Sequence, residues 1–360
     1  MQDQFNHTRL MRFLGWLVHS QANLWIDVGK LETRLLKGRL KPVQAPVYVT
    51  GLARAGTTLL LSVLESHHRC TSFKYCDYYG AFTPYLADRV FRAAGLGTAQ
   101  KSERAHDDGM LVNAYSPEAM EEVIWMQFFD YLHTTDTSNV VAAATDHPEF
   151  ETVYRATLQK LLLCRRAERI VCKNNYNITR IAYLGRLFAD ARFVLAVREP
   201  VDHIASIMRQ HQINLERYST PHHLDYLRNA GHFEFGRGRI PITAAVDTTR
   251  RIEELWDQGR DVEGWAEYWN AIYAWTYKNV LGDAKFKDRC TVVPFERLCA
   301  QAEAKITDIL AFCNLDAEPD WVRAWGRRID YKPKYEAPFS AAEREMIADI
   351  CGATAALYGY

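Results

Sequence analysis

The stretch VYVTGLARAGTTLLLSVLESHH, residues 47–68, has the pattern of a buried strand, a glycine-bounded turn and a helix. Its two glycines, Gly51 and Gly56, are separated by four residues, as in the phosphate-binding sequence GxxxxGKS/T. Threonine occupies position 57, where that sequence has lysine, and Thr58 follows it. The stretch therefore predicts a loop that holds an anion without the usual lysine.

The other features of an anion-binding loop are kept. Glycines permit a tight turn, successive backbone N–H groups can point inward, and the following helix presents its positive end to the ligand. Arg54 places a cation inside the loop. Without the lysine, and without an obvious magnesium-binding carboxylate after a later strand, hydrolysis of a nucleoside triphosphate is disfavoured. Taken alone, the turn is also compatible with a strand–helix connection that binds nothing.

Four short β-branched runs predict buried strands, and a helix is expected after each of them. This alternation predicts a parallel sheet with helices on both faces, which is an α/β three-layer sandwich of P-loop type. Ligands of such a sheet bind at the carboxyl ends of its strands. The runs are PVYVTG from 46, ERIVCK from 168, RFVLAVR from 192 and CTVVPF from 290, and the helices are expected at 57–66, 177–188, 201–211 and 296–313.

An amphipathic helical segment, residues 1–40, is expected before a single domain at 41–360. A helix packed on the domain is one interpretation of this segment, and contact with a membrane surface or a partner is the other. No stretch has the roughly 18 apolar residues of a membrane-spanning helix, and polar residues interrupt any signal-peptide core. We therefore expect a cytoplasmic protein. The apolar residues of the segment that fall at helical spacing are Leu10, Phe13, Leu14 and Leu17.

Two insertions are expected in the domain, at about 70–165 and 212–262. The first contains the acidic stretch SPEAMEEVIWMQFFDYLH, which predicts a helix with Ser116 as its N-cap and Pro117 at its first position. The second contains GHFEFGRGRIP and predicts a loop or lid.

The charge and cysteine content exclude some classes of protein. The 44 basic and 44 acidic residues give a formal net charge of zero, so non-specific binding to a nucleic-acid backbone is not expected. Hydrophobic residues make up 48% of the chain, which is ample for a buried core. None of the eight cysteines forms a CxxC pair and several lie in apolar runs, which favours buried reduced thiols over a disulfide framework.

A second anion-binding motif follows a later strand. In RFVLAVREPVDHIASIMRQ, Arg198 comes at the end of the predicted strand and Ser206 lies eight residues further on, in the next helix. An ordinary ion pair of Arg198 with Glu199 or Asp202 is the alternative. Together with the glycine-bounded loop, the motif predicts two phosphate sites at one edge of the sheet, suited to the 5′ and 3′ groups of a single nucleotide.

The two motifs resemble the 5′- and 3′-phosphate motifs of sulfotransferases that use 3′-phosphoadenosine-5′-phosphosulfate (PAPS), in the branch of bacterial and Golgi-type enzymes that have arginine in the loop. The resemblance covers residues 46–66 and 168–211 well and the segment VVPFERLCAQAEAKITDILAFCNL moderately. Ala53 replaces the usual proline and Ala55 the usual serine. The resemblance implies that PAPS is bound without a metal, and that its binding residues are Arg54, Ala55, Gly56, Thr57, Thr58, Leu59, Arg198 and Ser206.

Sulfuryl transfer needs fixed donors at the bridging oxygen of the leaving phosphate, which Arg54, Thr57 and Thr58 can supply. In related cytosolic enzymes a lysine and, two residues later, a catalytic histidine follow a strand. This chain has Lys173 and Asn175 at those places. Lys173 can hold the sulfuryl oxygens, but an amide cannot accept the acceptor's proton.

The general base is therefore expected elsewhere. The resemblance implies a carboxylate just beyond the loop helix, which makes Asp77 the first candidate. A helix-capping role is its alternative. His106 is the second candidate, with a pKa near working pH. Glu118, Glu121 and Glu122 are third, because carboxylates in a first helical turn often only complement the helix dipole.

Late in the chain, Lys332 and Lys334 are expected to close over the 3′-phosphate, with a solvated basic loop as the alternative. The predicted function is transfer of a sulfuryl group from PAPS to a hydroxyl of a carbohydrate, glycolipid or small molecule. A nucleotide-binding scaffold without catalysis and a P-loop kinase are the competing functions. No nucleic-acid partner and no metal are expected.

Overall fold

The computed structural model describes residues 21–95, 102–103, 111–218, 220–329 and 337–360. Its main sheet has five strands in the order β2-β5-β1-β6-β7, and each neighbouring pair runs parallel. The predicted parallel sheet is thereby confirmed, and the short strand β2 is an addition to it. The strands are β1 (Val47–Thr50), β2 (Cys70–Ser72), β5 (Arg169–Lys173), β6 (Arg192–Val197) and β7 (Cys290–Pro294), and a separate two-stranded sheet pairs β3 (Ser102–Glu103) with β4 (Leu111–Val112).

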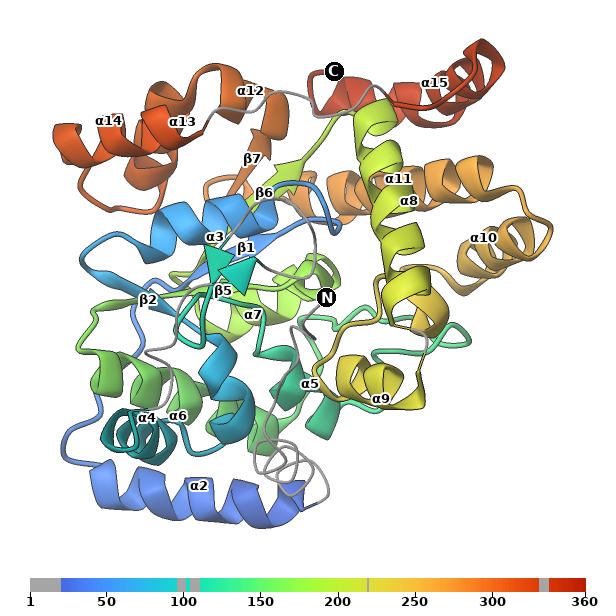
Figure 1. The fold of residues 1–360 in the computed structure, drawn as a ribbon. Helices are drawn as coiled ribbons and strands as arrows, with labels where there is room; N and C mark the ends of the chain where they lie inside the picture. The colour runs from blue at the N-terminus through green and yellow to red at the C-terminus, as the bar shows by residue number, and fades with distance from the viewer. Residues whose placement is uncertain (1–20, 96–101, 104–110, 219, 330–336) are drawn as a thin grey trace.

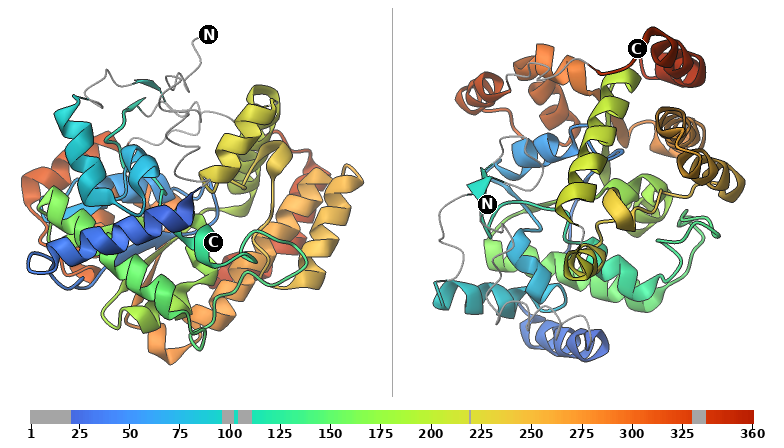
Figure 2. Two further views of the ribbon diagram at one scale, coloured as in Figure 1. Left: turned by 90° about the horizontal axis from the view of Figure 1, so that it is seen from below. Right: turned by 45° about the vertical axis from the view of Figure 1, so that its right-hand side comes forward.

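Helices enclose the main sheet on both faces (Figures 1 and 2). They are α2 (Ala22–Leu36), α3 (Thr57–Glu65), α4 (Pro84–Ala93), α5 (Glu122–Phe128), α6 (Pro148–Arg165), α7 (Ile181–Leu187), α8 (Pro200–Arg217), α9 (Pro221–Asn229), α10 (Val246–Asp257), α11 (Asp261–Thr276), α12 (Phe295–Ala300), α13 (Ala302–Phe312), α14 (Pro319–Arg328) and α15 (Ala341–Leu357). Short 3-10 helices are η1 (Tyr75–Gly80), η2 (Asn175–Thr179), η3 (Gly236–Gly238) and η5 (Ala284–Phe286), and the π-helix η4 (Tyr277–Leu281) extends α11.

Alternation along β1 explains the three layers. Val47 and Val49 pack with the side chains of α3 and α13, whereas Tyr48 lies in the core on the opposite face with residues of α6 and α7. Every residue of this strand is buried. Burial on both faces is typical of parallel strands, whose crossover helices cover each side of the sheet.

The first insertion differs from its prediction at the start of the acidic helix. Ser116 does not cap a helix and Pro117 does not begin one, because α5 starts only at Glu122. Pro117 instead forms a β-bridge with Lys74, and the Tyr75 amide donates to the Ser116 carbonyl at 3.2 Å. Pairing with another segment therefore replaces the local capping signal.

The second insertion is mostly helical, but its stretch GHFEFGRGRIP, residues 231–241, forms the predicted loop, which contains only the short 3-10 helix η3. α8 continues to Arg217, and α9 and α10 follow it before α11. In the described part of the chain, no helix is both long and apolar enough to cross a membrane. The four apolar residues of the N-terminal segment lie outside the described residues, and α2 accounts for the last part of that segment.

Candidate active site

The carboxyl ends of three adjacent strands carry the cationic residues singled out in the sequence. β1 lies between β5 and β6 and leads into the loop that contains Arg54. Lys173 ends β5 and is in register with Val49, and Arg198 directly follows β6. The structure therefore brings Arg54, Lys173 and Arg198 to one edge of the sheet.

The loop after β1 uses left-handed backbone at three positions. Gly51 has φ 143°, Arg54 has φ 74° and Gly56 has φ 95°. A Cβ atom at Gly51 would lie 2.3 Å from the carbonyl oxygen of Ala196, and one at Gly56 would lie 2.5 Å from the Phe295 ring. Arg54 is the strained residue of the three, because a side chain disfavours this region. The turn ends at the N-terminus of α3, where the first amides have no intrahelical acceptor.

Arg54 also connects the two motifs. Its Nε donates to the hydroxyl oxygen of Ser206, in α8, at 3.3 Å. The loop after β1 and the helix after β6 are therefore linked by side chains. Both Arg54 and Ser206 are partly exposed, so a ligand can reach them.

Buried side chains support the loop from below. The ring of His203 lies 2.9 Å from the carbonyl oxygen of Ala53, and Trp269 donates to its other nitrogen at 3.1 Å. Because Trp269 is only a donor, the nitrogen of His203 that faces Ala53 carries the hydrogen. Burial lowers the pKa of His203 to about 3, so the ring is neutral at physiological pH. The Tyr273 hydroxyl accepts from the Leu52 amide at 3.2 Å.

Arg198 lies against α12, which follows β7. Its guanidinium carbon is 5.2 Å from the centre of the Phe295 ring, and its Nε is 3.9 Å from a carboxylate oxygen of Glu296. Glu296 also accepts from the Tyr360 hydroxyl at 2.5 Å. Of the predicted alternative partners, Glu199 caps α8, where its carboxylate accepts from the backbone amide of Asp202 at 2.8 Å.

The end of β5 faces a carboxylate of the first insertion. Lys173 Nζ lies 3.4 Å from Glu118 Oε1, and the Tyr75 hydroxyl donates to Glu118 Oε2 at 2.8 Å. Lys173 and Glu118 are both buried. The β-bridge between Lys74 and Pro117 holds two segments of the insertion together. The same pairing that prevents a helix from starting at Pro117 therefore positions the Glu118 carboxylate.

A comparison with family models decides the identity of the chain. Residues 46–233, more than half of the chain, match the model described as "Sulfotransferase family". The chain belongs to the sulfotransferase family. A search of curated proteins gave no match.

Solved structures agree in fold. The sulfotransferase STF9 from Mycobacterium avium is similar with a TM-score of 0.52 and 14% identity, over 98% of this chain and 85% of that one. Sulfotransferase STF1 from Mycobacterium tuberculosis H37Rv also matches, with a TM-score of 0.44 and 16% identity, over 95% of this chain and 82% of that one. The similarity to STF9 shows that the chain has the P-loop-like α/β fold of sulfotransferases.

The sulfotransferase has a series of hydrogen bonds between polar side chains at this site that the sequence did not reveal. The Thr57 hydroxyl donates to Asn175 Oδ1 at 3.3 Å, and Asn175 Nδ2 donates to Glu234 Oε1 at 3.0 Å. Asn175 thus uses the place of the family's histidine to connect the loop helix with the second insertion. Glu234 lies in the stretch GHFEFGRGRIP, but no spacing rule marks it as a partner of β5.

Glu121 and Glu122 do not serve as surface charges at a helix start. Glu121 accepts from Tyr154 at 2.8 Å, and burial raises its pKa. Glu122 makes a two-pronged ion pair with Arg180 at 2.7 and 2.8 Å and accepts from His133. Burial alone would raise the pKa of Glu122, but Arg180 and His133 outweigh it and hold the pKa at about 2. Both carboxylates stabilise the core beneath the site.

Asp77 lies in η1 with both of its oxygens engaged. Arg165 Nη2 is 2.5 Å from Oδ1, and the Lys74 amide donates to Oδ2 at 2.7 Å. Burial raises the pKa of Asp77, and Arg165 opposes this shift. Three other predicted site residues, His106, Lys332 and Lys334, lie outside the described residues.

Within the described part of the sulfotransferase, one cluster could hold a metal ion by proximity. His67, His68 and Asp316 have ligand atoms within 4.8 Å of one another. His67 and His68 come just before β2 and so lie at the amino end of that strand, opposite the edge that carries Arg54. Asp316, which follows α13, meets them there.

Proposed function

We propose that the chain transfers a sulfuryl group from PAPS to an acceptor hydroxyl. The observation that carries this proposal is the 3.3 Å contact between Arg54 and Ser206, which joins two anion-binding motifs at the carboxyl edge of the sheet. A nucleotide with a phosphosulfate at its 5′ position and a phosphate at its 3′ position suits two neighbouring anion sites. A nucleoside triphosphate carries its charge at one end only.

The residues present fit such a donor. The loop offers the Arg54 guanidinium, the hydroxyls of Thr57 and Thr58 and the amides at the start of α3 for the 5′ group, with Gly56 and Leu59 as backbone donors. The Ala55 amide instead closes the turn by donating to the Leu52 carbonyl at 3.1 Å. Arg198 and Ser206 offer a cation and a hydroxyl for the 3′-phosphate. When bound, PAPS supplies the activated sulfuryl group. Arg54 and Lys173 then stabilise the negative charge at the transferred group and at the leaving phosphate.

We place the general base at Glu118 in preference to Asp77. Glu118 faces Lys173, which is the residue expected beside the sulfuryl group, and it already accepts a hydrogen bond from the Tyr75 hydroxyl. A carboxylate that accepts from one hydroxyl can accept from that of an acceptor and take its proton. Both carboxylates have hydrogen-bond partners, but Asp77 is paired at 2.5 Å with Arg165, whereas Glu118 lies beside Lys173.

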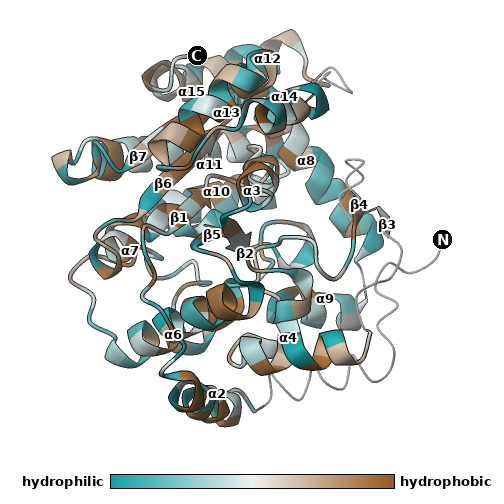
Figure 3. Cartoon of the chain, turned by 90° about the vertical axis from the view of Figure 1, so that its left-hand side faces the viewer, coloured by the Kyte–Doolittle hydropathy of each residue, from teal (hydrophilic) through white to brown (hydrophobic). Residues whose placement is uncertain are grey.

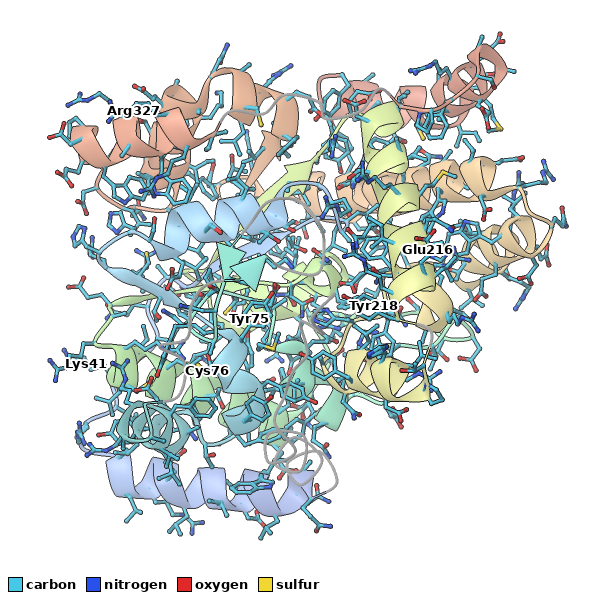
Figure 4. The ribbon with its side chains drawn as sticks, in the orientation of Figure 1. Lys41, Tyr75, Cys76, Glu216, Tyr218 and Arg327 are labelled. Atoms are coloured by element: carbon cyan, nitrogen blue, oxygen red, sulfur yellow. The ribbon has the colours of Figure 1, made fainter. Side chains whose placement is uncertain are left out.

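The acceptor side is aromatic in character. Tyr75 of η1 and Tyr226 of α9 are partly exposed, and the Tyr226 ring packs 5.7 Å from that of the buried Tyr78. In Figure 4, Tyr75 and Tyr218 lie between the level of α3 and that of α9. Tyrosine rings with polar tips suit the faces and hydroxyls of a sugar or a phenol. We propose a hydroxyl of a carbohydrate, glycolipid or small molecule as the acceptor.

The experiment is a transfer assay with PAPS and a panel of sugars, glycolipids and phenols, read by the mass gain of the sulfated acceptor. Transfer by the unmodified chain and its loss in Glu118→Gln, with nucleotide binding retained, would support the proposal. Binding of adenosine 3′,5′-bisphosphate without transfer to any acceptor would favour the non-catalytic scaffold. Transfer of phosphate from ATP would overturn both.

A further inference from the structure

Two helices next to each other expose apolar residues outward. The described residues expose six large hydrophobic side chains, and five of these lie on α2 and α4. On α2 they recur along the side opposite its buried residues. On α4 the two are one helical turn apart. We call the five residues the α2–α4 face, and they are Leu24, Leu31, Leu35, Leu86 and Val90, with exposed fractions of 57%, 52%, 78%, 48% and 53%.

The two helices are joined side by side. The Leu86 amide, in the first turn of α4, donates to Glu32 of α2 at 2.6 Å, and Arg39, just after α2, donates to the Tyr85 hydroxyl at 2.9 Å. Figure 1 shows α2 along one edge of the molecule, with α4 and α6 next to it. In Figure 3, brown hydrophobic residues alternate with teal hydrophilic ones on α2. The exposed apolar residues of α2 and α4 thus lie on neighbouring, hydrogen-bonded helices.

Arginines line a pocket formed by α4, the segment after α2 and the end of α6. The pocket has a volume of about 550 Å³, and its lining includes five arginines: Arg39, Arg89, Arg92, Arg165 and Arg166. Hydrogen bonds from Arg89 and Arg39 hold the pKa of Tyr85 below its ordinary value. The pocket's one acidic lining residue, Asp88, is buried against Arg92 at 2.7 Å.

Basic residues also flank the apolar stripe at the C-terminal end of α2. Arg34, Lys37, Arg39 and Lys41 are exposed or partly exposed there, and no acidic residue lies between them after the buried Glu32. The chain as a whole has no net charge, with 44 basic and 44 acidic residues. The positive charge beside the leucines is therefore a local feature of this surface.

We propose that the α2–α4 face docks on a bilayer that contains anionic phospholipids. Exposed leucines flanked by cationic side chains match a membrane interface, where the apolar groups enter the acyl boundary and the guanidinium groups meet lipid phosphates. The arginine-lined pocket supplies a site for a phosphate headgroup beside the inserted leucines. Docking of this kind is independent of sulfuryl transfer.

The test is sedimentation of the full chain with vesicles of phosphatidylcholine alone or mixed with phosphatidylserine. The unmodified chain should sediment with the mixed vesicles, and raised salt should weaken binding because the charge contribution is screened. Leu31→Glu with Leu35→Glu should weaken binding about tenfold or more. Arg39→Gln with Arg89→Gln should do the same.

Matched controls come from other surfaces of the chain. Leu357→Glu, at the sixth exposed hydrophobic residue, on α15, and Arg323→Gln, on α14, should leave vesicle binding unchanged. Adenosine 3′,5′-bisphosphate titration of each variant reports whether the fold is retained. Equal losses in the controls would overturn the proposal.

Failure of the full chain to bind either kind of vesicle would also overturn the proposal. If light scattering then showed a concentration-dependent dimer that Leu35→Glu abolishes, a second copy of the chain would be the occupant of the α2–α4 face. If it showed a monomer, the face would be covered by the chain's own first twenty residues or would be bare.

Discussion

Arg54 Nε donates to the hydroxyl of Ser206 at 3.3 Å, across the gap between the loop after β1 and the helix after β6. The same arginine has a φ of 74°, in the left-handed region that costs a non-glycine residue about 1 kcal/mol or more. The fold keeps a strained conformation at the residue that connects its two anion-binding motifs. Strain of this kind is common at functional sites.

Replacement of Arg54 by glycine separates the effect of its strained backbone on stability from the effect of its side chain on nucleotide binding. Glycine adopts the same backbone without penalty, so Arg54→Gly should leave the thermal midpoint unchanged or raise it, while affinity for adenosine 3′,5′-bisphosphate falls about tenfold or more. Arg54→Lys keeps the charge and the strain but loses the planar fork, and an intermediate affinity is expected. Calorimetry of both variants checks the expectation, and normal affinity in Arg54→Gly would remove Arg54 from the site.

Replacement of Glu118 and of Asp77 by their amides should affect different properties, turnover in the first case and stability in the second. Glu118→Gln should reduce kcat about 100-fold or more with little change in nucleotide affinity, because a base acts only in the chemical step. Asp77→Asn should mainly lower the free energy of unfolding, by about 3 kcal/mol, because it leaves the buried Arg165 without its charge partner. The reverse pattern, with turnover lost only in Asp77→Asn, would restore Asp77 as the base.

The Glu122–Arg180 pair should dominate the stability of the region beneath the site. Glu122→Gln leaves a buried guanidinium without its counter-charge and should cost about 3–5 kcal/mol in urea unfolding. Asp320→Asn, in an exposed pair with Arg323, is the matched control and should change stability by no more than about 0.5 kcal/mol. The pKa of Glu122 is lowered from 4.5 to about 2 in the folded state. Its contribution to the free energy of unfolding is therefore complete above about pH 4.5 and is lost as the pH falls toward 2. An equal effect of both substitutions would contradict this role.

His203 should make stability depend on pH in the acidic range. Burial lowers its pKa to about 3 from an ordinary value of 6.5, so the folded state binds fewer protons than the unfolded state between these values. Stability is then lost as pH falls from about 6.5 toward 3, by roughly 4 kcal/mol in all. The difference in unfolding free energy between the unmodified chain and His203→Gln should therefore shrink over this window. A constant difference would show that His203 does not titrate with folding.

The sheet was predictable because its strands are short apolar runs that carry their own signal. Residues 47–50, 169–173, 192–197 and 290–294 all form strands inside the predicted runs. β2 has three residues, Cys70–Ser72, and is specified by its pairing with β5 rather than by its own pattern. The helix expected from Ser116 failed for the same reason, since Pro117 pairs with Lys74.

In the site, too, the features set by local sequence were predictable and those set by contacts between distant residues were not. The glycine spacing around Arg54 and the spacing from Arg198 to Ser206 are local, so the sequence revealed them. The Glu118–Lys173 pair and the Asn175–Glu234 contact join residues 55 and 59 positions apart, and only the folded insertions bring them together. Contacts made by insertions have no fixed spacing in the sequence.

Calorimetric titration of the unmodified chain and of Arg198→Ala shows whether the sheet edge holds two separate anion sites. The ligands are adenosine 3′,5′-bisphosphate, adenosine 5′-monophosphate and ATP with magnesium. We expect the bisphosphate to bind about tenfold or more tightly than the monophosphate, and Arg198→Ala to remove this difference without weakening binding of the monophosphate. Arg323→Ala, an exposed arginine on α14, should change neither affinity. Equal binding of the two adenosine nucleotides, or a preference for ATP with magnesium, would contradict the two-site account.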